Sequence, residues 1–129
     1  MPLEALNVVP VEGEPRVVYR AVSTDDVESP ELIESFKSSA ALGLPPRKGS
    51  PEERFEFIHG GISCWRTRRE AEKVAQRWGH GDFIAEVRLA PDEGVLVAEW
   101  GSRGHVTVSA DPVKLRDMTV DIVAVGQEP

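Results

Sequence analysis

The chain has one cysteine, Cys64, and one tyrosine, and no apolar stretch in it approaches the ~20 residues that a membrane-spanning helix requires. A single thiol excludes an internal disulfide, so nothing indicates an oxidising compartment. The first residues carry no basic segment leading into an apolar one, and therefore predict no signal peptide. We expect a cytoplasmic protein with no membrane partner; a toxin delivered by a dedicated secretion machine would have the same features.

Basic residues are also scarce, since 15 Lys and Arg face 22 Asp and Glu, which gives a net charge of -7. This balance argues against nucleic acid as the main partner, because phosphate contacts need a clustered basic surface. It suits a basic surface on a protein target instead. The three histidines, His59, His80 and His105, together with Cys64, have no zinc-ligand spacing, so we expect no metal site.

Secondary-structure signals are clear along most of the chain. Strands are predicted over residues 16–22, 62–65, 83–89, 95–100, 105–108 and 118–125 from β-branched and alternating apolar residues. Helices are predicted after Ser29-Pro30, after the capping box Ser50-Pro51-Glu52-Glu53, and after the second box Thr67-Arg68-Arg69-Glu70. In the third helix Ala71, Val74, Ala75 and Trp78 form an apolar stripe, which predicts that Trp78 belongs to the core.

This order predicts one α+β domain with a mostly antiparallel sheet and two or three helices concentrated in the N-terminal two thirds. Residues 1–15, rich in Glu and Pro, are predicted to be a flexible arm, 16–125 the domain and 126–129 a tail. The Asp92-Glu93-Gly94 turn predicts a hairpin or close pair over 83–100, and Asp111-Pro112 is interpreted as a turn.

Several short strings in this order resemble the ADP-ribosyltransferase family. Val18-Tyr19-Arg20-Ala21 is similar to the family's first motif, with Arg20 in the place of the residue that holds NAD. Gly61-Ile62-Ser63-Cys64-Trp65-Arg66-Thr67 is similar to the second motif, with Ser63 as its serine. The alanine-rich helix and the strands at 82–89 and 104–125 follow in the family's order, so the resemblance covers roughly residues 16–125.

The resemblance implies an NAD-dependent transferase, acting as a toxin or effector on a macromolecule. Tyr19, Arg20, Ser63 and Trp65 would then bind the cofactor, with Arg20 on the phosphates, Ser63 ordering the site and Trp65 lining the pocket. Three of these have a plainer interpretation: Arg20 as a solvated strand arginine, Ser63 as an ordinary half-buried serine, and Trp65, like Trp100, as a core aromatic.

The catalytic position departs from the family. His105 stands where members usually carry a glutamate, and a neutral histidine does not supply the negative charge that stabilises the departing nicotinamide's cationic ribose. Glu99, at a strand end beside a glycine loop, is the favoured replacement, and Glu86 is another. His105 itself could act as a base or contact the ribose, or simply be exposed.

Three hypotheses follow from the sequence. The first is an NAD-dependent transferase in which Glu99 or His105 completes the site. The second is a catalytically inactive relative that serves as a protein-binding or inhibitory module, which the missing glutamate motivates. The third is a small α+β domain unrelated to that family.

Overall fold

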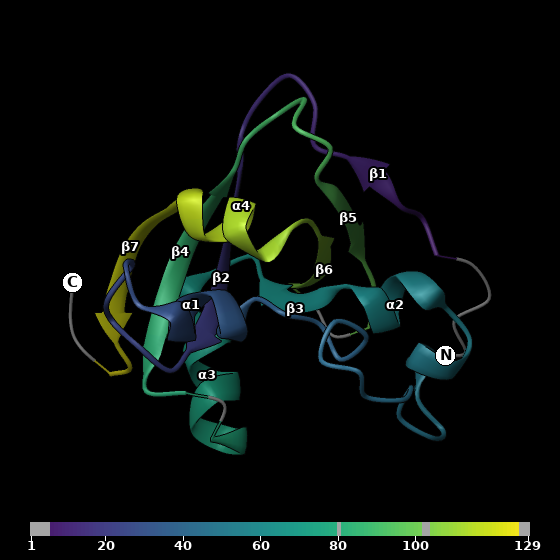
Figure 1. Ribbon diagram of the computed structural model, residues 1–129, viewed down its shortest axis with the longest axis horizontal. Coiled ribbons are helices and arrows are strands. Elements are labelled where there is room, and N and C mark those ends of the chain that lie inside the picture. The colour runs from purple at the N-terminus through teal and green to yellow at the C-terminus, as the bar shows by residue number, and fades with distance from the viewer. Residues whose placement is uncertain (1–5, 80, 102–103, 127–129) are drawn as a thin grey trace.

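The computed structural model describes residues 6–79, 81–101 and 104–126, and Figure 1 shows their arrangement. The elements in chain order are β1 (Val9–Pro10), β2 (Arg16–Val22), α1 (Pro30–Ser35), the short 3₁₀ helix η1 (Pro51–Glu53), α2 (Glu56–Gly60), β3 (Ile62–Trp65), α3 (Arg68–Trp78), β4 (Phe83–Leu89), β5 (Leu96–Glu99), β6 (His105–Ser109), α4 (Pro112–Asp117) and β7 (Thr119–Ala124). The predicted α+β class with an antiparallel sheet core is confirmed.

The described strands form one seven-stranded sheet in the order β1-β5-β6-β3-β2-β4-β7, and every neighbouring pair is antiparallel. The weakest junction lies between β2 and β3, where a single register pair joins Tyr19 to Trp65. The sheet is therefore two well-paired groups of strands, β1-β5-β6-β3 and β2-β4-β7, that meet at one residue pair.

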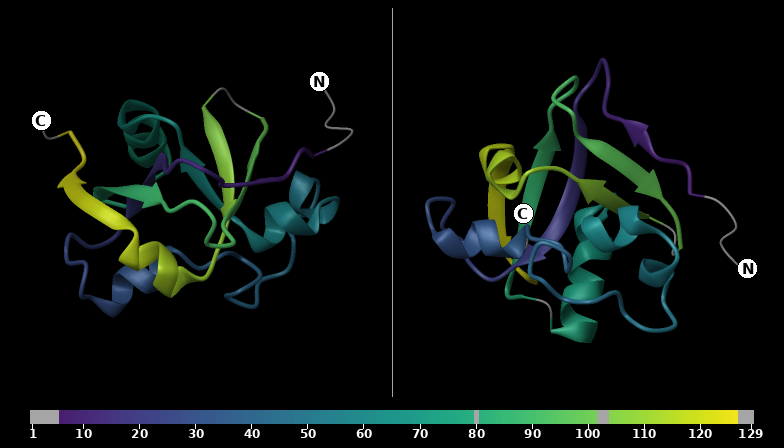
Figure 2. Two further views of the ribbon diagram at one scale, coloured as in Figure 1. Left: turned by 90° about the horizontal axis from the view of Figure 1, so that it is seen from above. Right: turned by 45° about the vertical axis from the view of Figure 1, so that its right-hand side comes forward.

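Helices cover both faces of the sheet, as the two views in Figure 2 show. The face toward α1 and α4 carries the larger core, in which Leu32 of α1 and Leu115 of α4 pack on Val18, Val87 and Val106. The opposite face carries a smaller core, in which Ala71 and Ala75 of α3 pack on Ile84. We call these the α1 face and the α3 face.

The predicted helix starts are present with their caps. The side chains of Ser29, Ser50 and Thr67 accept hydrogen bonds from the backbone N–H groups of Glu31, Glu52 and Glu70. These bonds satisfy donors that have no partner inside the helix. The segment 50–60 is broken into η1 and α2, so the single short helix expected there is in fact two pieces.

Four further expectations are corrected by the structure. Residues 83–100 are not a hairpin, because β4 pairs with β2 and β7 while β5 pairs with β1 and β6. Asp111-Pro112 does not make a simple turn but begins α4, which places a helix in the C-terminal third. The predicted arm contains β1, whose successor Val11 is buried. Residues 1–5 of that arm and residues 127–129 of the predicted tail lie outside the described part.

The fourth correction concerns Trp78, which is 63% exposed instead of belonging to the core. It is the last residue of α3, and Figure 1 shows this end of the helix extending beyond the sheet. Its ring lies against the guanidinium of Arg77, 5.2 Å from the ring centroid. The apolar stripe correctly predicts that Ala71 and Ala75 are buried. Trp78 lies at the end of the helix that extends beyond the sheet, so it has no strand to pack on.

Candidate functional site

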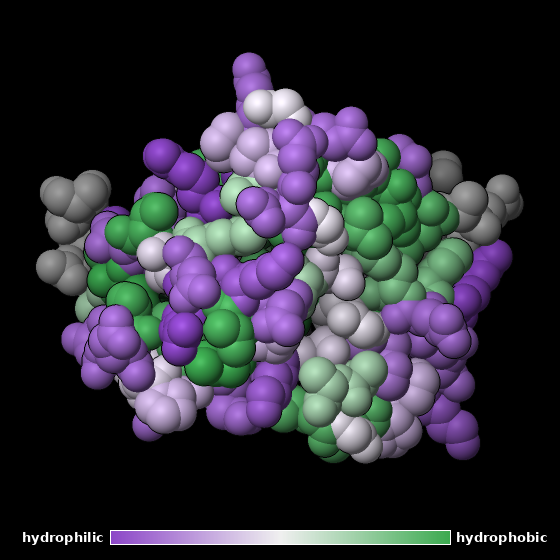
Figure 3. Space-filling model, turned by 45° about the horizontal axis from the view of Figure 1, so that its top comes forward, coloured by the Kyte–Doolittle hydropathy of each residue, from purple (hydrophilic) through white to green (hydrophobic). Residues whose placement is uncertain are grey.

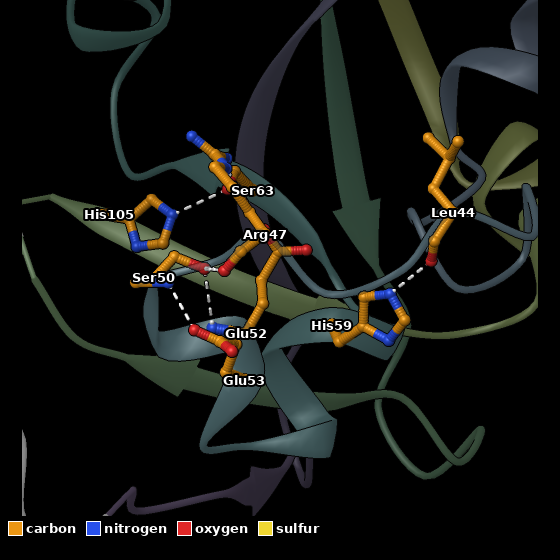
Figure 4. Close-up of polar contacts among 9 residues, drawn as sticks. Leu44, Arg47, Ser50, Glu52, Glu53, His59, Ser63 and His105 are labelled. Atoms are coloured by element: carbon orange, nitrogen blue, oxygen red, sulfur yellow. Dashed lines mark hydrogen bonds and ion pairs between the residues drawn. The ribbon is translucent and has the colours of Figure 1, made fainter.

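Ser63 and His105 meet on neighbouring strands at the α3 face. Trp65 of β3 lies opposite His105 of β6, and Ser63 lies opposite Thr107, so these side chains project from the same side of the sheet. The Ser63 hydroxyl is 3.0 Å from Nε2 of His105, and Figure 4 shows the two side chains pointing toward each other. Ser63 is exposed, whereas His105 is 8% exposed.

Two tryptophans hold the imidazole in place. Trp65 meets His105 edge-on with ring centroids 4.9 Å apart, and Trp100 does so at 4.8 Å. Trp100 also donates its indole N–H to the Thr107 hydroxyl at 2.6 Å, and its backbone carbonyl lies 3.1 Å from Nδ1 of His105. The histidine side chain is thus fixed by two rings and by contacts at both nitrogens.

The electrostatics of His105 follow from this packing. Burial lowers the pKa of the His105 imidazole below its ordinary value, and the hydrogen bond to the Trp100 carbonyl opposes that shift only in part. The imidazole is therefore neutral at pH 7. Because a carbonyl oxygen only accepts, Nδ1 carries the proton, and Nε2 presents a lone pair to the Ser63 hydroxyl.

Arg20 reaches the same neighbourhood from the other face of the sheet. It follows Tyr19 on β2, so its side chain lies on the α1 face, next to the buried Cys64. Nε donates to the Ser35 carbonyl at 2.8 Å, and a terminal nitrogen donates to the Ser63 carbonyl at 2.6 Å. Arg20 thereby bridges α1 and β3 where the β2–β3 pairing ends.

Glu99 does not approach His105. Its register partner is Val106, which belongs to the core of the α1 face, so Glu99 shares that face. The carboxylate is 3.5 Å from Arg16 and 3.5 Å from Arg66, and its side chain is 52% exposed. The structure thus separates Arg20 and Glu99 from the group formed by Tyr19, Ser63, Trp65 and His105.

Tyr19 lies beside the serine–histidine pair but borders a different hollow. Its register partner on β4 is Glu86, and burial raises the pKa of the Tyr19 phenol. A cavity of about 30 Å³ opens here, which has room for a water molecule and not for a nicotinamide ring. Its lining consists of Tyr19, Arg68, Ile84, Glu86, Asp121 and Val123.

The loop before His105 is anchored to the start of α3. Gly104 has φ of +85°, and a Cβ at this position would collide with the Glu70 carboxylate. The Gly104 carbonyl accepts from the Arg66 N–H at 2.8 Å, and the Thr67 hydroxyl donates to Glu70 at 2.9 Å. The capping box of α3 therefore fixes the backbone that leads into His105.

The structure adds two groups that sequence reasoning did not assign to the site. The Trp100 carbonyl sets the tautomer of His105, and the Thr107 hydroxyl fixes the Trp100 ring. A backbone carbonyl leaves no mark in a sequence. Thr107 carried a usable signal, because it alternates with His105 on a predicted strand and so shares its face.

No protein-family model, curated protein or solved structure matches this chain. Within residues 6–79, 81–101 and 104–126, no group of three or more His, Cys, Asp and Glu side chains is arranged to hold a metal ion. None of the helices in that same part is long and apolar enough to cross a bilayer. Any functional proposal for this chain is therefore argued from its own geometry, beginning with the Ser63–His105 contact.

Proposed function

We propose that this chain is an ADP-ribosyltransferase-like domain that binds NAD on the α3 face. The contact between Ser63 and His105 carries the proposal, because it joins the serine of the second motif to the position where the family usually has its glutamate. Trp65 flanks the pair and offers an aromatic surface for a nicotinamide or adenine ring.

The role of Arg20 differs in this proposal from the one that the resemblance alone implies. The guanidinium holds the Ser63 carbonyl, so it positions the serine from the far side of the sheet. Its contact to the Ser35 carbonyl uses a second donor. Since NAD is proposed to bind on the α3 face, we expect Arg20 to support the site through the Ser63 backbone and not to bind the phosphates.

The geometry favours His105 over Glu99 as the group that completes the site. A neutral imidazole cannot stabilise the cationic ribose as a carboxylate does, so we expect NAD binding with slow transfer. Another group in the bound complex would have to supply the negative charge that stabilises the cationic ribose. NAD binding and ADP-ribosyl transfer are therefore separate expectations and need separate measurements.

Isothermal titration with NAD, paired with a labelled-NAD transfer assay, tests the proposal. Ser63→Ala is expected to weaken NAD binding by roughly tenfold, the loss of about one hydrogen bond. Glu99→Gln, on the opposite face, is the matched control and should leave the affinity unchanged. Absence of heat with wild-type protein would remove the NAD proposal, whereas binding without transfer would leave only a binding function.

A second candidate function is a non-catalytic relative that binds or inhibits another protein. Exposed apolar side chains at the β1–β5 edge favour it: Val8, Val9 and Leu96 are 37%, 40% and 37% exposed. Figure 3 shows hydrophobic residues gathered on the side of the molecule where β1 and β5 lie. The net charge of -7 suits a partner with a basic rim around an apolar centre.

A pull-down from lysate tests this second function. Recovery of one stoichiometric partner, by a chain that neither binds nor uses NAD, would favour it. Leu96→Asp is expected to abolish that recovery, while Val120→Asp, on the exposed surface of β7, should not. If both variants retain the partner, the β1–β5 edge is not its binding surface. Glu99→Gln should leave partner binding nearly unchanged, whereas it would abolish transfer if Glu99 were the catalytic acid.

A further inference from the structure

The Ser63 hydroxyl has the arrangement of an activated nucleophile, independent of any bound dinucleotide. Its oxygen lies 3.0 Å from Nε2 of a neutral imidazole, and the far nitrogen of that ring donates to the Trp100 carbonyl at 3.1 Å. A nucleophile, a base and a third group that orients the base are the three parts of serine-based acyl transfer. Here the third group is a backbone carbonyl.

The Ser63 hydroxyl is exposed to solvent, whereas the His105 imidazole is buried. Ser63 is exposed although Ile62 and Cys64 beside it are 5% and 1% exposed, because strand alternation turns the serine to the α3 face. His105 is 8% exposed, and its Nε2 is 3.0 Å from the Ser63 hydroxyl. A substrate carbonyl can therefore reach the hydroxyl oxygen while the imidazole keeps its orientation.

The surroundings also indicate the substrate class. The rings of Trp65 and Trp100 flank the imidazole, and Trp100 already uses its N–H on Thr107. What these rings offer to a ligand is apolar surface. The acyl or aryl group of an uncharged ester matches such a lining better than an anionic group does.

We propose that Ser63 is a nucleophile and His105 its general base, and that together they hydrolyse uncharged esters with apolar acyl or aryl groups. In the first step the Ser63 oxygen bonds to the ester carbonyl carbon, and its proton moves to Nε2 of His105. The carbon–oxygen bond to the alcohol breaks, and the alcohol leaves with that proton. Water then attacks the acyl-serine, giving its proton to Nε2, and the serine departs with the proton returned.

A fluorophosphonate probe tests the nucleophile directly. Ser63 would displace fluoride and form a phosphorus–oxygen bond, which intact-mass spectrometry detects as one adduct per chain and peptide mapping locates. Ser63→Ala should abolish the adduct. Ser23→Ala, which removes an exposed hydroxyl that contacts Glu31 and Ser35, is the matched control and should retain it.

The base is tested by the rate of the same reaction and by hydrolysis of p-nitrophenyl butyrate. His105→Gln is expected to slow both by about 100-fold, the usual contribution of a general base. The wild-type rate should decrease when the pH is lowered past the pKa of His105, which lies below the ordinary histidine value, because Nε2 is then protonated. This decrease at acid pH should be absent in His105→Gln. Circular dichroism of each variant verifies that it is folded.

A wild-type protein that forms no adduct overturns the proposal, as does an adduct that persists in Ser63→Ala or maps to another residue. A rate that is equal in wild type and folded His105→Gln removes the histidine from the mechanism. The NAD titration is performed without the probe, so failure of the esterase proposal and failure of NAD binding are read from different experiments.

Discussion

The imidazole of His105 and the hydroxyl of Ser63 lie 3.0 Å apart, although 42 positions separate them in the chain. Antiparallel pairing of β3 with β6 brings them together, and the alternation of strand residues turns both to the α3 face.

Protein stability should fall as the pH drops below about 6.5, the ordinary histidine pKa, because of His105. Its pKa is lowered in the folded state by burial, so the unfolded chain takes up a proton that the folded chain does not. Urea unfolding of wild type and His105→Gln across pH 5 to 8 measures the effect. The difference in unfolding free energy between the two should shrink toward acid pH, and a difference that stays constant would contradict this role of His105.

Arg20→Met should destabilise the fold by about 2 kcal/mol, since it removes charge-assisted hydrogen bonds to the carbonyls of Ser35 and Ser63. Urea unfolding gives the change in free energy, and Arg88→Met, an exposed position on β4, is the control. An unfolding free energy within about 0.5 kcal/mol of wild type would show that the two bonds contribute little.

The Cys64 thiol should be inert in the native protein. It is 1% exposed, and burial raises the pKa of this thiol to about 11, with the Arg20 guanidinium opposing the shift. Since the thiolate is the reactive form, titration with a thiol reagent at pH 8 should give no fast reaction. Denaturant should restore one equivalent per chain, and rapid labelling without denaturant would contradict the buried placement.

Gly104→Ala should destabilise the chain by about 1–3 kcal/mol and slow any chemistry at His105. A residue with a Cβ is strained at φ of +85°, and this Cβ would meet the Glu70 carboxylate. The double variant Gly104→Ala with Glu70→Ala removes the collision but not the backbone strain, so it should recover only part of the stability. Full recovery would assign the whole effect to the collision.

Glu99→Gln should change the unfolding free energy by no more than about 0.5 kcal/mol, because pairs that are this exposed contribute little. Thermal unfolding at low and high salt checks this, and the small difference should vanish at high salt. A larger loss would mean that Glu99, Arg16 and Arg66 act as a cooperative network.

Local sequence signals predicted the helices and strands better than they predicted which strands pair. The caps at Ser29 and Thr67 and the alternation in β4 depend on neighbouring residues, and all are present. The partners of β4 and β5 depend on the whole fold, which is why the expected hairpin over 83–100 is absent. Asp111-Pro112 illustrates the same limit, because a cap and a turn use the same residues.

The sequence named several residues of the candidate site but did not predict how they are arranged. Ser63, Trp65 and His105 were recognisable from short strings, and they do lie together. Their separation from Glu99 and from the Arg20 side chain follows from strand register, which a sequence without its pairing partners does not contain.

The bridge that Arg20 makes has a mechanical consequence for the molecule. Between β2 and β3 the backbone supplies one register pair, and a guanidinium supplies the contacts beyond it. The hydrogen bonds of Arg20 therefore reinforce the junction at which the backbone ladder is shortest, beside the buried core that Val18, Cys64 and Val106 share across it. Removing that side chain would leave the core alone to hold the two groups of strands together at this point.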